Sequence, residues 1–377
     1  MPQEQNPFAD LPAALVEDIL GKATATGDLL TDRFRNLKRE RQEYRRVLQE
    51  KDLIVHESSL GYPPLPTTCG TDGSYAIERL LFADLIAAAA VAVEGLTPPS
   101  EKRHWDQPHH LSFVQVEPHH PDTSTVLRAV MLGKELILAT SAPHDLVMLD
   151  QTLTLPIIYF NQALNQAPDC PELKCSQEFL EHSLEYLEAY RSILRPHRSD
   201  KHFVGLPKYS SRREVGKIIQ SSEAHDDRGL LTFLLQAGEL TRPLSLEPPT
   251  QPWHLPGGLH SRAGSLAADI IDGLGEICIF YYKPHEWLPA LRIETARQVA
   301  LNPHRLAVVV QGLKHQCAVP SILEPYPLYL ADRTVKALAR AVPTFRQVAT
   351  QRLSERYDGD IGEVFFAMHG YRSESGR

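Results

Sequence analysis

Segments with the apolar period of a β-strand alternate along this chain with segments that have the period of an amphipathic helix, and this alternation limits the fold more than any other feature. Two buried strands separated by a glycine turn are expected within 71–96. Further strands are expected at 110–117, 146–149, 202–208, 276–284 and 291–296. Helices are expected at 124–140, 173–194, 227–240 and 327–353. Such alternation is typical of an α/β protein with a mixed central sheet flanked by helices.

The N-terminal part predicts a separate helical arm. Residues 11–52 have helical apolar spacing, and the second half is almost wholly charged, with Glu and Arg three or four residues apart. A solvated arm and a contact with a partner or a second copy are both open interpretations. We expect three parts: an arm at 1–60, a main domain at 61–345 with a helical insertion at 165–200, and a helix end with a polar tail at 346–377. A Pro-rich loop is expected at 243–257.

Charge and cysteine usage exclude several classes of protein. The 39 Lys and Arg against 47 Asp and Glu give a formal charge of −8, which argues against a histone-like basic coat but leaves room for a local basic groove or an acidic metal site. The five cysteines are scattered and form no CxxC pair, so we expect no disulfide framework and a cytoplasmic location. No signal peptide is recognisable, and the most apolar stretch, 80–93, is too short and too charged to span a membrane.

Four acidic residues stand in unusual surroundings. Asp72 lies in CGTDGS, before the expected glycine turn, and Asp150 ends the buried segment LVML. Glu135 lies in an otherwise apolar helix, and Asp332 lies at the start of the last helix, beside its apolar face. Each acid alone also fits a turn, cap or surface role. Buried carboxylates need partners, however, and the set of two strand-end Asp, a helix Glu and a helix-start Asp fits a two-metal site.

The order and spacing of several segments resemble those of the NurA nucleases, which are partners of HerA-type hexameric DNA translocases. The resemblance covers about residues 65–340. Its segments are TDGS (71–74), AAAAVAV (87–93), MLGKE (131–135), DLVMLDQTL (145–153), VGLPKYSS (204–211), EICIFYY (276–282), LRIE (291–294) and PYPLYLAD (325–332).

This resemblance implies an RNase H-like core, a homodimer and a DNA nuclease that uses Mn²⁺ or Mg²⁺. It implies 5′-to-3′ exonuclease and single-strand endonuclease activity on single- and double-stranded DNA, in end resection or anti-phage defence. Asp72 matches the first metal-binding Asp, Glu135 the Glu and Asp150 the second Asp. Asp332 stands where some members carry His. The second Asp of the family is followed by a DGSL-like sequence, whereas this chain reads DQTL at 150–153.

We expect the four acids to hold two ions, with Asp72 between them, for in-line hydrolysis of a phosphodiester bond. Lys208 is the candidate for steadying the scissile phosphate. Candidates for contacts with the DNA backbone follow it in sequence: Arg212, Arg213 and Lys217. Candidates for stacking on bases are Tyr209, Tyr281, Tyr282 and Trp287. At least one of Tyr281 and Tyr282 is expected to belong to the core instead.

Other chemistries find less support. The paired histidines of PHHLSFVQVEPHH, at 109–110 and 119–120, raise the question of zinc, but adjacent strand residues point to opposite faces and no cysteine is near in sequence. HExxH, GxSxG, Walker A and GxGxxG motifs are absent from the sequence, so peptidase, serine hydrolase, NTPase and dinucleotide-binding readings lose support. Two alternatives stay open: a non-catalytic interaction subunit of a translocase complex, and another carboxylate enzyme such as a glycosidase.

Overall fold

The computed structural model describes residues 11–221, 226–256 and 261–376. Its strands are β1 (Ile54–His56), β2 (Thr68–Leu80), β3 (Asp84–Glu94), β4 (His109–Glu117), β5 (Leu146–Leu149), β6 (His202–Gly205), β7 (Glu239–Thr241), β8 (Leu244–Ser245), β9 (Ile277–Lys283), β10 (Leu291–Ala296) and β11 (Gly370–Gly376). They form one sheet in the order β1-β7-β9-β10-β6-β5-β2-β3-β4, with β11 paired to β2 and β8 to β9. Strand β5 is parallel to β2 and β6, and the other pairs are antiparallel. The prediction of a mixed central sheet is confirmed.

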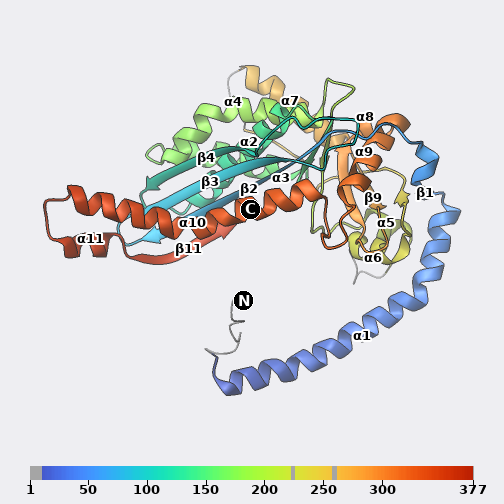
Figure 1. Ribbon diagram of the computed structural model, residues 1–377, viewed down its shortest axis with the longest axis horizontal. Coiled ribbons are helices and arrows are strands. Elements are labelled where there is room, and N and C mark those ends of the chain that lie inside the picture. Colours follow the sequence, from blue (N-terminus) through green and yellow to red (C-terminus); the bar gives the residue numbers. More distant parts are fainter. Residues whose placement is uncertain (1–10, 222–225, 257–260, 377) are drawn as a thin grey trace.

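Helices cover both faces of this sheet (Figure 1). The long helices are α1 (Ala13–Glu50), α2 (Thr123–Ser141), α3 (Leu155–Gln166), α4 (Lys174–Leu194), α7 (Ser261–Gly275), α9 (Pro303–Gln316) and α10 (Tyr326–Arg356). The short ones are η1 (Glu57–Leu60), η2 (Ala167–Asp169), α5 (Glu214–Ile218), α6 (Asp227–Leu234), α8 (Arg297–Ala300) and α11 (Ile361–Ala367). Helix α2 packs on one face, which we call the α2 face, together with α3, α4 and α7. Helices α9 and α10 cover the opposite face, the α10 face.

Strands β2 and β3 are buried on both faces because α2 covers one side and α10 the other. The run of four alanines at 87–90 gives β3 small side chains, so both helices approach the sheet closely. Strands covered on both faces read as near-continuous apolar runs, which is why this segment lacks the alternation of a half-exposed strand.

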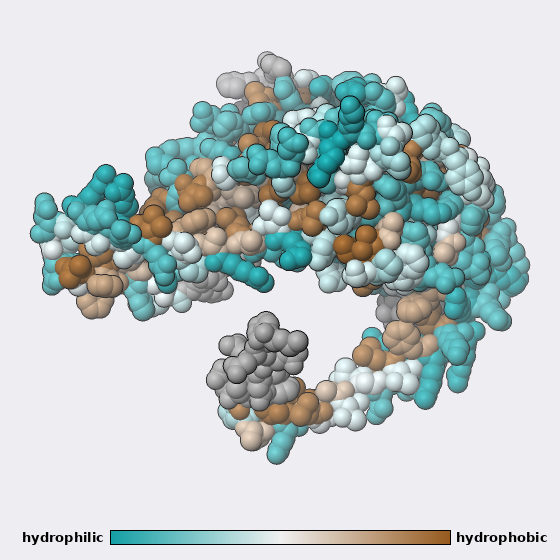
Figure 2. Space-filling view, in the orientation of Figure 1, coloured by the Kyte–Doolittle hydropathy of each residue, from teal (hydrophilic) through white to brown (hydrophobic). Residues whose placement is uncertain are grey.

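Helix α1 projects from the body as an arm, as predicted (Figure 1). Its buried residues are Leu37 and Leu48, near the end that meets the body. There Arg45 forms an ion pair with Glu239 at 2.6 Å. Apolar side chains are exposed on the distant part of the arm, and Figure 2 shows apolar side chains along it. Most of the helix therefore gains little from burial against its own chain.

Three local predictions are wrong. Gly73 lies inside β2, which continues to Leu80, so the turn to β3 falls at 81–83 rather than after Asp72. The helix expected at 227–240 ends at Leu234, and β7 follows. The expected polar tail contains α11 and strand β11, which extends the sheet beside β2. Residues 1–10 of the expected arm, 257 of the expected loop and 377 of the tail lie outside the described residues. Within the described residues, no helix combines the length and apolar character needed to cross a bilayer.

Candidate metal centre

Three aspartate side chains from distant parts of the chain meet at one point of the sheet. Carboxylate oxygens of Asp72 on β2, Asp150 directly after β5 and Asp332 on α10 lie within 4.8 Å of one another. Asp72 is 3% exposed and Asp332 6%, and the side chain of Asp150 is 1% exposed. Carboxylates this close and this buried repel one another when ionised, so the group requires compensating positive charge.

The strand pairing explains why Asp72 and Asp150 meet. Thr71 on β2 pairs in parallel register with Leu149 on β5, and the backbone N–H of Asp150 donates to the Thr71 carbonyl at 3.2 Å. Successive side chains of a strand point to opposite faces. The residues that follow this pair, Asp72 and Asp150, therefore both turn toward the α10 face.

A glycine lets α10 bring the third aspartate close. A Cβ atom placed on Gly70 of β2 would lie 2.7 Å from backbone atoms of both Pro327 and Leu328. Helix α10 therefore starts in direct contact with the backbone of β2, and any side chain at position 70 would push it away. Asp332 lies about one helical turn beyond Leu328, which places its carboxylate over Asp72.

Lys208 supplies positive charge inside this group. Its Nζ lies 2.8 Å from Asp150 Oδ2 and 3.5 Å from Asp332 Oδ1. The same Nζ lies 2.8 Å from Glu324 Oε2, an acid that was not among the predicted site residues although it stands next to the segment PYPLYLAD. A second cation, Lys336, lies 2.8 Å from Asp332 Oδ2, but its side chain is 60% exposed. One lysine therefore contacts three acids at the centre.

Glu135 approaches from the other side of the sheet. It lies on α2, is 2% exposed, and accepts a hydrogen bond from Thr71 Oγ1 at 3.4 Å. Because Thr71 and Asp72 are adjacent in β2, their side chains point to opposite faces. Glu135 is thus not part of the group of oxygens within 4.8 Å, which is made of the three aspartates. Its role as a metal ligand stays a prediction.

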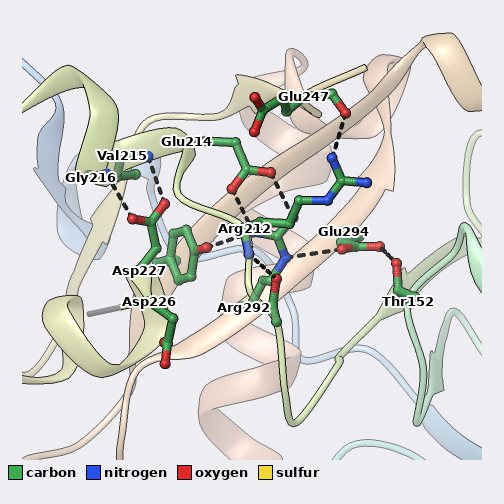
Figure 3. A network of polar contacts seen from close by, with 12 residues as sticks. Thr152, Arg212, Glu214, Val215, Gly216, Asp226, Asp227, Glu247, Arg292 and Glu294 are labelled. Atoms are coloured by element: carbon green, nitrogen blue, oxygen red, sulfur yellow. Dashed lines mark hydrogen bonds and ion pairs between the residues drawn. The ribbon is translucent and has the colours of Figure 1, made fainter. Parts of the chain in front are cut away.

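The turn that follows Asp150 is held by a buried polar network (Figure 3). Thr152 Oγ1 donates to Glu294 Oε2 at 2.6 Å, and the other oxygen of Glu294 accepts from Arg292 Nε at 3.0 Å. The side chain of Arg292 is fully buried and also donates to both oxygens of Glu214, at 2.9 and 3.0 Å. This chain of contacts fixes the turn, and with it the position of Asp150.

Burial and pairing shift the pKa values in this network. Burial opposes the charge of Arg292, but its hydrogen bonds to Glu214 raise its pKa well above the ordinary value. Burial likewise acts to raise the pKa of Glu214, and the bonds from Arg292 outweigh it and lower that pKa. Burial raises the pKa of the nearby Asp227 to about 6, although Asp227 accepts two backbone hydrogen bonds from Val215 and Gly216. The Arg292–Glu214 pair is therefore charged at neutral pH.

Solved structures of NurA nucleases share this arrangement of sheet and helices. The NurA nuclease from Sulfolobus solfataricus superposes with a TM-score of 0.60 and 13% identity, over 90% of this chain and 98% of that one. A structure of NurA with manganese gives 0.54, and a further NurA structure gives 0.56, each at 13% identity over 90% of this chain and 99% of that one. The chain has the NurA fold. The predicted RNase H-like α/β class with an N-terminal helical arm is confirmed. No protein-family model and no curated protein matches the sequence.

A groove adjoins the three-aspartate group through Lys208, which lines the groove and contacts Asp150 and Asp332. It encloses about 630 Å³ and is lined by Lys208, Tyr209, Arg228 and Thr232, among others. Tyr209 is 93% exposed, so the face of its ring is open to a ligand. Arg228 donates to the carbonyls of Lys208 and Ala290, and burial lowers its pKa. The groove thus carries an exposed ring, two cationic side chains and the carboxylate of Asp226.

The other predicted DNA contacts lie at the end of the polar network. Arg212 donates to the backbone carbonyl of Glu247 at 3.0 Å, and Lys217 forms an ion pair with the carboxylate of the same residue. Arg213 donates to the carbonyl of Ser221. Arg212 and Lys217 thus lie together, and each is already engaged within the chain.

Two of the predicted stacking residues belong to the core. Tyr281 and Tyr282 on β9 are both 0% exposed, so neither ring is available to a base. The Tyr281 hydroxyl accepts from Arg292 at 2.6 Å, and the Tyr282 hydroxyl donates to Glu57. The alternative that at least one of them is core is confirmed for both. Trp287 is 46% exposed and stacks on His285, with 4.4 Å between the ring centroids.

Proposed function

We propose that this protein is a metal-dependent DNA nuclease that hydrolyses phosphodiester bonds, with 5′-to-3′ exonuclease and single-strand endonuclease activity. The observation that carries the proposal is the meeting of Asp72, Asp150 and Asp332 within 4.8 Å in a NurA fold. The proposed setting is DNA end resection or anti-phage defence.

The donor atoms favour Mn²⁺ or Mg²⁺. The three aspartates offer only carboxylate oxygens, which hard divalent ions prefer over the softer nitrogen and sulfur ligands. One of the structures with the same fold is that of NurA with manganese. We propose two ions held by Asp72, Asp150 and Asp332, with Glu135 as the fourth acid that acts on the same site. When bound, the ions would lower the pKa of an attacking water and stabilise the leaving oxygen.

The remaining residues of the site would bind and position the DNA. Lys208 contacts Asp150 through an ion pair, so its Nζ is already fixed next to the acids where a scissile phosphate would lie. Tyr209 would stack on a base of a single strand in the adjoining groove. Beyond this groove, the phosphate backbone of the DNA would contact Arg212, Arg213 and Lys217. Such contacts weaken as the salt concentration rises.

A second candidate, a non-catalytic interaction subunit, is favoured by a specific observation. Lys208 contacts Asp150, Glu324 and Asp332 at once, so the acids are partly neutralised by the chain itself. A group balanced in this way could be purely structural. The two candidates differ in whether divalent ions bind to the acids and whether DNA is cut.

We also propose that the protein works as a homodimer with a HerA-type hexameric translocase. The arm supports a self-contact because its apolar residues Leu15, Ile19, Leu29 and Leu30 are between 43% and 66% exposed. The net charge of −8 fits a nuclease that leaves much of the grip on duplex DNA to a partner. Light scattering tests the dimer: the double change Leu29→Asp and Leu30→Asp should reduce the mass to that of a monomer, and a monomeric unaltered chain would contradict the proposal.

A cleavage assay tests the nuclease proposal. End-labelled single- and double-stranded DNA is incubated with the protein in Mn²⁺, Mg²⁺ or EDTA, with and without a translocase partner. We expect products with a divalent ion, none in EDTA, and none from the Asp72→Ala variant. The matched control is Asp200→Asn, which removes an exposed carboxylate paired with Arg198. Equal products in EDTA, or full activity of Asp72→Ala, would refute the metal mechanism.

A further inference from the structure

A second cluster of metal-binding side chains lies away from the three aspartates. His120 follows β4, Asp122 directly precedes α2, and Cys170 follows η2. One ligand atom from each lies within 4.8 Å of the others. His120 and Cys170 are 50 residues apart in sequence, which explains why the sequence offers no cysteine beside the paired histidines.

The distances in this cluster are close to those of a tetrahedral zinc site. Cys170 Sγ lies 3.6 Å from His120 Nε2 and 3.9 Å from its Nδ1, and His120 Nδ1 lies 3.8 Å from Asp122 Oδ2. Zinc binds sulfur at about 2.3 Å and nitrogen at about 2.0 Å, so two such ligands of a tetrahedral ion are roughly 3.6 Å apart. For an ion at Nδ1, the nitrogen that is also near Asp122, the distance to Sγ is 3.9 Å, so the ligands would move slightly closer together on binding. Nδ1 also accepts a hydrogen bond of 3.2 Å from the Asp122 backbone N–H, a weak contact that an ion bound at Nδ1 would replace.

Burial and charge also favour a cation here. Cys170 is 5% exposed, whereas the side chains of His120 and Asp122 are 26% and 34% exposed, so the cluster is closed on the sulfur side and open to water for a fourth ligand. The carboxylates of Asp122, Glu172 and Asp169 surround the Cys170 thiol with negative charge. A divalent cation would offset that negative surrounding and stabilise the thiolate.

We propose that His120, Asp122 and Cys170 form a zinc site that is separate from the three-aspartate centre. The mixed nitrogen, oxygen and sulfur donors select Zn²⁺ over Mn²⁺ and Mg²⁺, which prefer oxygen alone. A zinc ion there would join the loop that leads into α2 to the loop that leads into α4. Glu117 already links the same regions, since its two oxygens accept from the backbone N–H groups of Lys174 and Cys175 at 2.8 and 2.6 Å.

Cobalt substitution tests the site directly, because a thiolate bound to Co²⁺ gives a charge-transfer absorption that oxygen ligands do not. The full chain is stripped of metal, titrated with Co²⁺, and then with Zn²⁺. We expect this absorption in the unaltered chain, its loss on adding Zn²⁺, and its absence in Cys170→Ser. The matched control is Cys278→Ser, which removes another free, buried thiol and should keep the absorption. Asp72→Asn should also keep it, which separates this site from the nuclease proposal.

Two further measurements decide the outcome. Zinc content by mass spectrometry should be one ion lower per chain in His120→Ala than in the unaltered protein, and far-ultraviolet circular dichroism checks that each variant is folded. If Cys170→Ser does not fold, Asp122→Asn replaces it as the test variant. Asp122→Asn should weaken zinc binding at least tenfold. An unaltered chain without the thiolate–Co²⁺ absorption, or a folded Cys170→Ser that binds zinc as tightly, would overturn the proposal.

Discussion

The ammonium nitrogen of Lys208 lies 2.8 Å from Asp150 Oδ2 and 3.5 Å from Asp332 Oδ1, so one positive charge is shared by two of the three clustered aspartates. This lysine provides the compensating charge that buried carboxylates need. A divalent ion entering the group would take over part of that role and compete with the lysine for the same oxygens. Divalent ions should therefore stabilise the fold, and the gain in stability should be larger when Lys208 is replaced by a neutral residue.

Lys208→Met should lower the unfolding free energy in EDTA by about 2 kcal/mol, because it removes the cation that contacts Asp150, Glu324 and Asp332 at a partly exposed site. Adding Mn²⁺ should restore the stability, and the rise in Tm should exceed that of the unaltered chain. Lys336→Met is the control, because the 60% exposed Lys336 contributes little to stability. Thermal scans with and without Mn²⁺ make the comparison, and an equal Mn²⁺ effect in all three proteins contradicts the account.

Substitutions of Glu135 and Asp72 should differ in how far they reduce Mn²⁺ binding and DNA cleavage. Asp72→Asn removes an oxygen donor from the three-aspartate group and should abolish both Mn²⁺ binding and cleavage. Glu135→Gln alters an acid that contacts Thr71 on the opposite face, so we expect a loss of about 10-fold in cleavage rate, typical of a residue that orients a ligand. Cleavage rates over a range of Mn²⁺ concentrations check this. If Glu135→Gln loses metal binding as fully as Asp72→Asn, Glu135 binds the metal directly.

Gly70→Ala should separate α10 from the sheet. The added Cβ would lie 2.7 Å from backbone atoms of Pro327 and Leu328, which cannot move as a flexible side chain can. We expect a loss of about 1–3 kcal/mol in unfolding free energy, together with weaker metal binding because Asp332 moves with α10. The control is Gly21→Ala on the exposed arm, where a Cβ meets nothing within 4 Å and should raise helix stability slightly. Urea unfolding and Mn²⁺ titration measure both effects, and an unchanged Gly70→Ala would contradict the packing argument.

The local patterns of the sequence were enough to place the acids on their elements. Asp150 follows a buried strand, Glu135 lies on an apolar helix, and Asp332 lies near the start of the last long helix, as expected. The turn predicted at Gly73 was wrong. A glycine after an acid suggests a turn, but here it lies within β2 and against Met131 of α2, where a small residue lets the helix approach.

The relationships between distant elements could not be predicted in the same way. Glu135 contacts Thr71 rather than Asp72 because of how the side chains of β2 alternate between the two faces of the sheet and how α2 packs on one of them. That Glu324 reaches Lys208 depends on how the turn before α10 crosses the sheet. Tyr281 lies in a strand whose two faces are both covered, so its aromatic character alone did not reveal that it is buried. Each is a consequence of long-range packing rather than of local periodicity.

The stability of the protein should fall as the pH rises from about 4 to about 6 because of Asp227. Burial raises its folded pKa to about 6, above the unfolded value near 3.8, so the folded state holds the proton more tightly and loses this advantage as the pH passes through the folded pKa. The loss of unfolding free energy due to Asp227 is at most about 3 kcal/mol. Glu214, whose pKa is lowered, acts in the opposite sense, with stability lost as the pH falls below its ordinary range.

Asp227→Asn removes this titrating group but keeps an oxygen for a backbone hydrogen bond. Its stability relative to the unaltered chain should therefore improve steadily between about pH 4 and about pH 6.5. Urea unfolding at several pH values checks the slope. If the unfolding free energies of the two proteins change in parallel with pH across that range, Asp227 does not titrate as its burial implies.

The most direct test of the central claim is calorimetric titration of the metal-free protein with Mn²⁺, because the claim is that Asp72, Asp150 and Asp332 together bind divalent ions. The unaltered chain and the surface control Asp200→Asn should bind two ions with similar affinity. Asp150→Asn should lose measurable binding while keeping its circular dichroism spectrum. If folded Asp150→Asn binds Mn²⁺ as the unaltered chain does, or if the unaltered chain binds none, the three aspartates are not a metal centre.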